Sequence, residues 1–112
     1  MNVSCYAAHT SDTPLVPHHI TRRQVEAQDV HIDIEFCGVC HTDILYDKND
    51  RGRTTYPIVP GYEIVGTVKA LGSAVTDLQI GQRVAVDCFV RSCHHCSSCQ
   101  ADMEQYCLAG FT

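Results

Sequence analysis

The sequence predicts a mainly β, barrel-like domain with little helix. Short segments rich in β-branched residues recur between residues 30 and 86, and glycine and proline separate them. No long amphipathic helix is predicted, and from Cys88 onward cysteines replace the hydrophobic pattern. A chain of 112 residues is long enough for one domain of this kind.

The predicted elements follow one another along the chain. The first strand covers residues 30–36, ends at Gly38, and has apolar residues in alternation with polar ones, as in a half-buried strand: Val30, Ile32, Ile34 and Phe36. Residues 41–46 are compatible with one short helix of about two turns. Residues 63–68 and 83–86, rich in β-branched side chains, are predicted as two further strands.

The charge balance of the chain disfavours two classes of partner. Eight basic residues against 13 acidic ones give a net charge of −5, so no basic stripe is available for nucleic acid or an anionic membrane surface. No segment approaches the ~20 apolar residues of a membrane span. The N-terminus lacks the basic and apolar regions of a secretory signal, so we expect a cytoplasmic protein with reduced thiols.

Residues 88–110, called the cysteine lobe below, carry the strongest motif. Four cysteines have the spacing C-x2-C-x2-C-x7-C: Cys93, Cys96, Cys99 and Cys107. Four thiolates satisfy tetrahedral zinc and leave no open coordination position, so the spacing predicts a structural zinc site. Such a site carries a net charge of −2, and backbone N–H groups are expected to offset it, together with three nearby cationic or titratable residues: Arg91, His94 and His95.

Other metal chemistry is compatible with parts of this pattern. An iron–sulfur cluster uses similar runs, although its fourth cysteine usually follows after three residues and precedes proline, whereas here Cys107 precedes leucine. The segment CGVCH at 37–41 has the form of a c-type haem attachment site, and its two cysteines have the spacing of a redox pair. The missing export signal argues against haem, because c-type haem is attached outside the cytosol.

Three stretches occur in a fixed order: CGVCHTD at 37–43, YPIVPGYEIVG at 56–66, and CFVRSC at 88–93, which leads into the cysteine lobe. Together they resemble the zinc-dependent medium-chain alcohol dehydrogenases, and most closely the cinnamyl-alcohol-dehydrogenase-like aldehyde reductases. The resemblance extends from Val30 to Thr112. It implies a GroES-like, partly open β-barrel with a short helix and a four-cysteine zinc lobe. Residues 1–112 would then be the N-terminal part of the catalytic domain, and the sequence contains no G-x-G-x-x-G of a nucleotide-binding domain.

The resemblance also implies a catalytic zinc site at the first two stretches. Cys40 matches its first ligand, whereas Tyr62 stands where the family has a ligating histidine. A phenol is a poor zinc ligand at neutral pH, because its pKa lies near 10. Glu63 is a substitute ligand by chemistry, but with Cys40 and Glu63 alone the site is two ligands short of a tetrahedron.

The same resemblance assigns roles to the residues that follow Cys40. His41 would lie towards the cofactor phosphates, Thr42 would pass the proton of the bound alcohol, and Asp43 would orient the ligands. Locally, Thr42 as a helix N-cap and Asp43 as a first-turn carboxylate fit equally well. Cys37 would be a packed thiol at the strand end.

The function implied by the resemblance is an oxidoreductase that interconverts alcohols and aldehydes with NADP or NAD. Its partners would be a small alcohol or aldehyde, and a homodimer is compatible with it. The 112-residue chain alone is expected to be inactive, because the segment that binds the nicotinamide cofactor is not in the sequence. The alternative is a free-standing structural-zinc module whose catalytic site has decayed.

Overall fold

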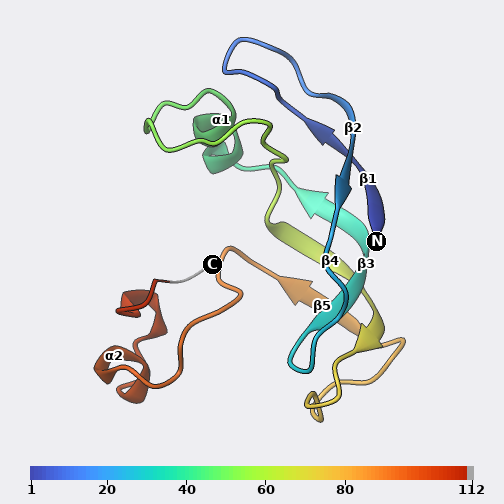
Figure 1. The fold of residues 1–112 in the computed structure, drawn as a ribbon, viewed down its shortest axis with the longest axis vertical. Coiled ribbons are helices and arrows are strands. Elements are labelled where there is room, and N and C mark those ends of the chain that lie inside the picture. The colour runs from blue at the N-terminus through green and yellow to red at the C-terminus, as the bar shows by residue number, and fades with distance from the viewer. Residues whose placement is uncertain (111–112) are drawn as a thin grey trace.

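The computed structural model describes residues 1–110, which form two separate antiparallel sheets, short helices and the cysteine lobe (Figure 1). Strands β1 (Asn2–Ala7) and β2 (Val16–Thr21) form a hairpin, and the second sheet has the order β3-β4-β5. Its strands are β3 (Val30–Gly38), β4 (Glu63–Leu71) and β5 (Arg83–Val86). The two sheets are not joined by strand pairing, which confirms the prediction of a mainly β, partly open barrel.

The N-terminal hairpin was not predicted from the sequence. In β1 the side chains of Val3, Cys5 and Ala7 are less exposed than those of the residues between them, so a period-two signal is present there. Strand β2 contains Pro17, a residue that counts against a strand because it cannot donate to the sheet ladder. Proline is tolerated there because β2 lies at the edge of a two-stranded sheet.

Strand β3 departs from the simple alternation that the sequence predicts. Ile34 pairs with Gly66 and Phe36 pairs with Val65, so β3 has one residue more than β4 between these pairs. Such a bulge reverses the facing of the residues beyond it, because successive side chains of a strand point to opposite faces. Ile34 and Phe36 therefore face opposite sides of the sheet, and both are more than half exposed, at 58% and 64%. The prediction that they share a half-buried face was wrong.

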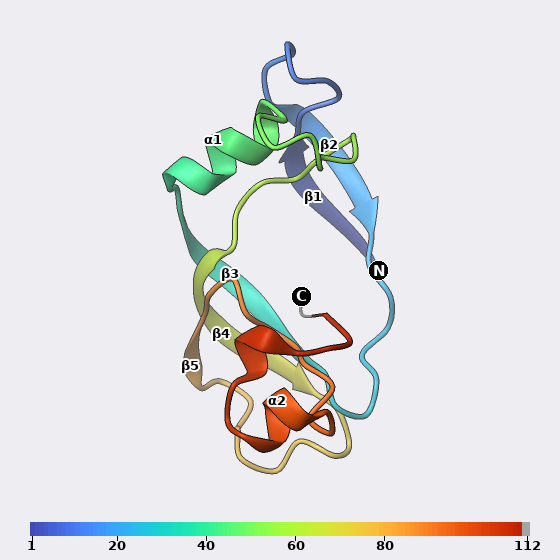
Figure 2. The same ribbon diagram turned by 90° about the vertical axis from the view of Figure 1, so that its left-hand side faces the viewer.

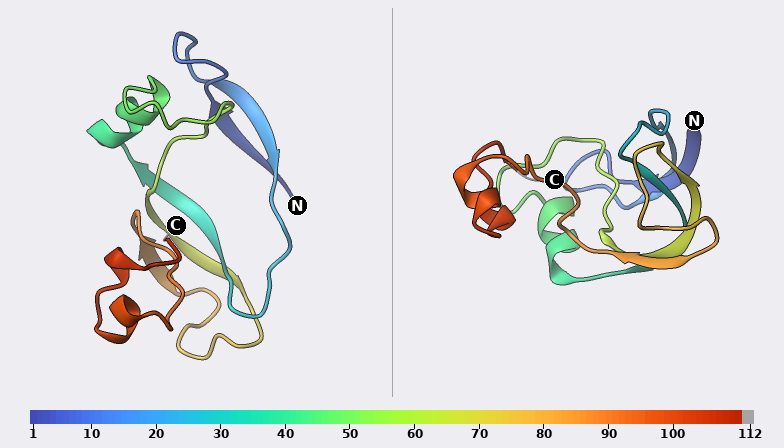
Figure 3. Two further views of the ribbon diagram at one scale, coloured as in Figure 1. Left: turned by 60° about the vertical axis from the view of Figure 1, so that its left-hand side comes forward. Right: turned by 90° about the horizontal axis from the view of Figure 1, so that it is seen from below.

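The helical elements are short and lie at two places. Helix α1 (His41–Asp47) follows β3 directly, whereas α2 (Ser97–Gln100) and a 3-10 turn (Glu104–Tyr106) lie within the cysteine lobe. The lobe leaves β5 and projects to one side of the sheets, away from the N-terminal hairpin (Figures 2 and 3). Within residues 1–110 no helix has the length and hydropathy that crossing a bilayer requires.

Candidate metal centre

The four cysteines of the lobe converge on one point. The sulfurs of Cys93, Cys96, Cys99 and Cys107 all lie within 4.8 Å of one another. Cys96 is 3.5 Å from Cys99 and Cys93 is 3.9 Å from Cys99, measured between sulfurs. Sulfurs bound to one tetrahedral zinc at about 2.3 Å are about 3.8 Å apart, so the observed spacing fits that ion. Among the described residues this is the only group of three or more histidine, cysteine or acidic side chains that could hold a metal.

Backbone amides of the lobe point at these sulfurs. The N–H of Cys96 donates to Cys93 Sγ at 3.3 Å, and the N–H of Cys93 donates to Cys107 Sγ at 3.4 Å. The N–H of Leu108 donates to Cys96 Sγ at 3.5 Å. Hydrogen bonds to an anionic acceptor stabilise its charged form, so these amides offset the negative charge of four thiolates. The two-residue gap between Cys93 and Cys96 produces the first of these bonds, because the tight turn directs the Cys96 amide back to the preceding sulfur. The other two form where the segment at Cys107 and Leu108 returns to the turn.

Burial and hydrogen bonding give the thiols of the lobe different pKa values. The Leu108 amide, together with the backbone of Cys99, lowers the pKa of Cys96 to about 6. Burial raises the pKa of Cys99 to about 11, against the effect of a hydrogen bond from the Ser92 hydroxyl. Cys99 is therefore the thiol that most needs a nearby cation to ionise.

Ser92 was missed by sequence reasoning. It is 6% exposed, its hydroxyl bonds to Cys99, and its oxygen lies 3.5 Å from Nδ1 of His94. His94 itself contributes a backbone N–H to Cys99, and Nδ1 of His95 lies 2.6 Å from the carbonyl of Cys93. A serine beside the first cysteine of a cluster gives no signal that distinguishes it from a loop residue.

A second polar cluster lies where helix α1 begins. Cys40 is the N-cap, and its sulfur accepts the N–H of Thr42 at 3.2 Å. The interpretation of Thr42 as the N-cap was therefore wrong, whereas Asp43 does lie in the first turn. The Asp43 carboxylate accepts the N–H of Cys40 at 2.9 Å through one oxygen, and the N–H of Gly61 at 2.8 Å through the other. Asp43 is 8% exposed and ties the start of α1 to the loop before β4.

Tyr62 completes this cluster. Its hydroxyl oxygen lies 2.6 Å from Cys40 Sγ, and its phenol also has a hydrogen bond with the Thr42 hydroxyl. The bond to Tyr62, with those from Thr42, lowers the pKa of the Cys40 thiol, and the same contact with Cys40 raises the pKa of Tyr62. Both shifts favour the phenol as the donor and the sulfur as the acceptor of this hydrogen bond.

Three of the residues singled out in the sequence lie at the margin of this cluster. His41 is the first residue of α1 and is exposed. Glu63 is exposed and packs over Gly38, with a carboxylate oxygen 2.7 Å from where a Cβ on that glycine would stand. Cys37 is exposed, so the expectation of a packed thiol was wrong. Its sulfur nevertheless lies 2.7 Å from where a Cβ on Gly61 would stand.

Comparison with known proteins agrees with the fold. Residues 26–112 match the family model of the alcohol dehydrogenase GroES-like domain. The chain is 50% identical over 105 residues to NADP-dependent alcohol dehydrogenase C 1 of Mycolicibacterium smegmatis, covering 94% of this chain and 30% of that protein.

Solved structures show the same relationship. A cinnamyl alcohol dehydrogenase of Sorghum bicolor superposes with a TM-score of 0.92 at 40% identity, over 96% of this chain and 31% of that one. The Helicobacter pylori cinnamyl alcohol dehydrogenase complexed with NADP(H) also gives 0.92, at 38% identity, over 100% of this chain and 33% of that one. The chain thus spans about a third of the length of these proteins. This chain belongs to the alcohol dehydrogenase GroES-like domain family.

Proposed function

We propose that residues 1–112 are the N-terminal, GroES-like part of an oxidoreductase that interconverts alcohols and aldehydes with NADP. The convergence of four cysteine sulfurs, in a chain 50% identical to an NADP-dependent alcohol dehydrogenase, carries this proposal. The match to the Helicobacter pylori cinnamyl alcohol dehydrogenase complexed with NADP(H) supports NADP over NAD. By itself the chain is proposed to be inactive, because its sequence has no dinucleotide-binding glycine motif.

Zinc fits the cysteine lobe. All four donors are sulfur, their spacing suits a tetrahedron, and amides already face the charge that zinc would leave on them. When bound, zinc would hold the lobe, residues 88–110, in shape; with four thiolate ligands it has no open position for a substrate. Its proposed role is therefore structural.

A catalytic zinc does not fit the residues at the start of α1 as they are arranged. Cys40 and Tyr62 are in direct contact, and the Glu63 carboxylate packs over Gly38. Within residues 1–110 no third cysteine, histidine or carboxylate joins them in a metal-sized group.

The remaining residues of this cluster are proposed to act without that ion. Thr42 would carry the proton of the substrate alcohol, because its hydroxyl is already hydrogen-bonded to the phenol of Tyr62. Asp43 would fix the two loops that bear the cluster, through its bonds to Cys40 and Gly61. His41, exposed at the start of α1, is proposed to face the phosphates of the cofactor.

Metal analysis of the purified 112-residue chain tests the lobe. We expect one zinc per chain, and Cys96→Ser should lose both the zinc and the folded lobe, because zinc-binding energy is folding energy in such sites. Cys88→Ser is the matched control, since Cys88 is exposed and outside the quartet. Zinc-free protein would contradict the proposal, and a Soret band would favour haem instead.

A chimera tests the activity. This chain, with Tyr62 kept, would replace the matching 30% of the M. smegmatis enzyme. We expect this chimera to reduce aldehydes with NADPH, and the isolated 112-residue chain to show no turnover. The second candidate function is a non-enzymatic zinc module, favoured by the Cys40–Tyr62 contact. It predicts a zinc-loaded lobe and no turnover in the chimera.

A further inference from the structure

We infer that Cys40 and Tyr62 form a direct thiol–phenol bridge that takes the place of a metal ion and joins helix α1 to the loop before β4. The chain then binds a single metal ion, in the cysteine lobe. This inference rests on the proposed function, because it concerns the site where related dehydrogenases are expected to hold a second zinc.

The distance between the two side chains supports a bridge. Cys40 Sγ and Tyr62 Oη are 2.6 Å apart. A thiolate bound to zinc at about 2.3 Å and an oxygen bound at about 2.0 Å would be about 3.5 Å apart in a tetrahedron. The pair would therefore have to open by about 1 Å before one ion could take both atoms.

The backbone opposes that opening. One carboxylate, Asp43, accepts the N–H of Cys40 at 2.9 Å and the N–H of Gly61 at 2.8 Å, and Gly61 immediately precedes Tyr62. Asp43 is buried at 8% exposure, so separating these two N–H groups would strand a buried charge. Cys40 Sγ itself is held a second time, because besides its contact with Tyr62 it accepts the N–H of Thr42 at 3.2 Å.

The side chains around Cys40 do not supply the further ligands that a metal ion would need. Among residues 1–110 the only metal-sized group of histidine, cysteine and acidic side chains is the quartet of the lobe. Glu63, next in sequence to Tyr62, has its carboxylate against Gly38. An ion at Cys40 would thus face one sulfur and one phenol, which is too few ligands for a stable zinc site.

A thermal double-mutant cycle on the 112-residue chain tests the bridge. Tyr62→Phe and Cys40→Ala are each expected to lower the Tm by about 4–8 °C, and the double variant should lose clearly less than the sum of the two. Cys40→Ala also removes the capping bond from the Thr42 N–H to Cys40 Sγ. This loss is the same in the single and the double variant, so it does not contribute to the measured coupling. Tyr46→Phe is the control, because Tyr46 is an exposed tyrosine of the same region, and it should leave the Tm unchanged. Additive losses would overturn the inference.

Titration with Co²⁺ alone tests the metal count and keeps the inference falsifiable if Cys40→Ala does not fold. Wild type should bind one equivalent, and Cys40→Ser, which keeps a capping oxygen, should also bind one. A second equivalent in wild type that disappears in Cys40→Ser would overturn the bridge. Loss of the first equivalent in Cys96→Ser reports on the lobe, so failure of the proposed zinc lobe and failure of this inference are distinguishable.

Discussion

Cys99 and Ser92 show how single residues tune the metal centre. Cys99 is the thiol whose pKa burial raises most, to about 11, and Ser92 is a buried side-chain donor that counteracts this. A hydroxyl bonded to a thiolate stabilises its anionic form and restricts its orientation, as outer partners of metal ligands generally do. Ser92 would therefore support retention of the proposed zinc without touching it.

Ser92→Ala is expected to speed the transfer of zinc to a competing chelator about 10-fold, because Cys99 loses its hydroxyl partner. The rate is measured by the absorbance of the zinc–chelator complex. Ser97→Ala, at an exposed serine of the same lobe, is the control and should leave the rate unchanged. Equal rates in wild type and Ser92→Ala would show that the hydroxyl has no such effect.

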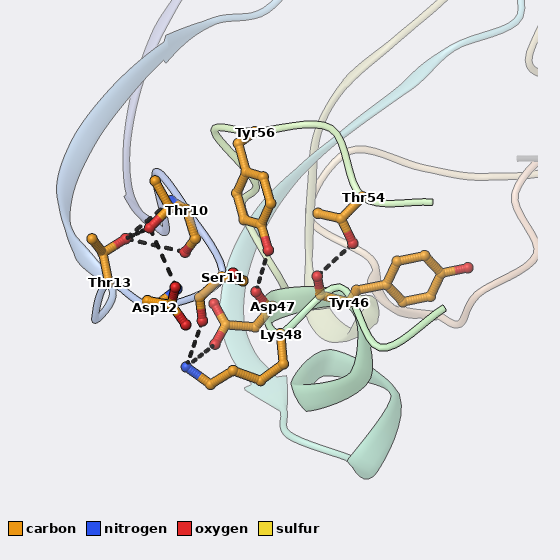
Figure 4. Close-up of polar contacts among 9 residues, drawn as sticks. All are labelled: Thr10, Ser11, Asp12, Thr13, Tyr46, Asp47, Lys48, Thr54 and Tyr56. Atoms are coloured by element: carbon orange, nitrogen blue, oxygen red, sulfur yellow. Dashed lines mark hydrogen bonds and ion pairs between the residues drawn. The ribbon is translucent and has the colours of Figure 1, made fainter. Parts of the chain in front are cut away.

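At the scale of elements, helix α1 is held at both ends. Asp43 and Cys40 fix its start, and its end is clamped by contacts with the following loop and with the N-terminal hairpin (Figure 4). Tyr56 donates its hydroxyl to the carbonyl of Asp47 at 2.6 Å, and Lys48 donates to the carbonyl of Ser11 at 3.2 Å. This clamp keeps α1, and with it the Cys40 cluster, in a fixed position relative to the sheets.

Tyr56→Phe should lower the Tm by about 2–8 °C, because the part-buried carbonyl of Asp47 loses its donor. It should also increase hydrogen exchange in the loop that follows α1, read by mass spectrometry. Tyr46→Phe provides the comparison: its ring points away from the clamp in Figure 4, so its hydroxyl should be dispensable. Equal stability of both variants would contradict a role for the Tyr56 hydrogen bond.

At the scale of the whole molecule, the chain exposes more surface than a compact monomer of its size, and large apolar side chains are among the exposed ones. Its accessible area is 8167 Å², against about 6,100 Å² for a typical monomer of 12.4 kDa. Its radius of gyration is 15.7 Å, against about 13 Å for a compact domain of 112 residues. Phe36 contributes to this surface, in a shallow groove of about 500 Å³ that also includes Val65 and Ala85.

We expect the isolated chain to self-associate as its concentration rises, because exposed apolar patches drive association. Phe36→Lys should shift the sedimentation distribution towards monomer. Gln79→Lys adds the same charge at an exposed polar position and should have less effect. A chain that stays monomeric at all concentrations would show that this exposed apolar surface does not drive self-association.

Local patterns predicted much of the molecule. The cysteine spacing predicted a four-sulfur centre, and β-branched runs predicted β3, β4 and β5, because turns and strand periodicity depend on neighbouring residues. The hairpin β1–β2 was not predicted, since Pro17 obscures its second strand. The exposure of Phe36 was not predicted either, because the bulge that turns it outward is visible only in the pairing with β4.

The sequence by itself determined the family, the quartet of cysteines and the mainly β fold, since each is encoded in short spacings. The family resemblance already placed Cys40 and Tyr62, which are 22 residues apart, at one site. Only the tertiary structure decided that their side chains touch directly and that Asp43 holds both of their loops. The physical reason is that contacts between distant segments depend on how β3, α1 and β4 pack together. Residue spacing along the chain constrains a tight turn, but it leaves open which side chains face each other across two loops.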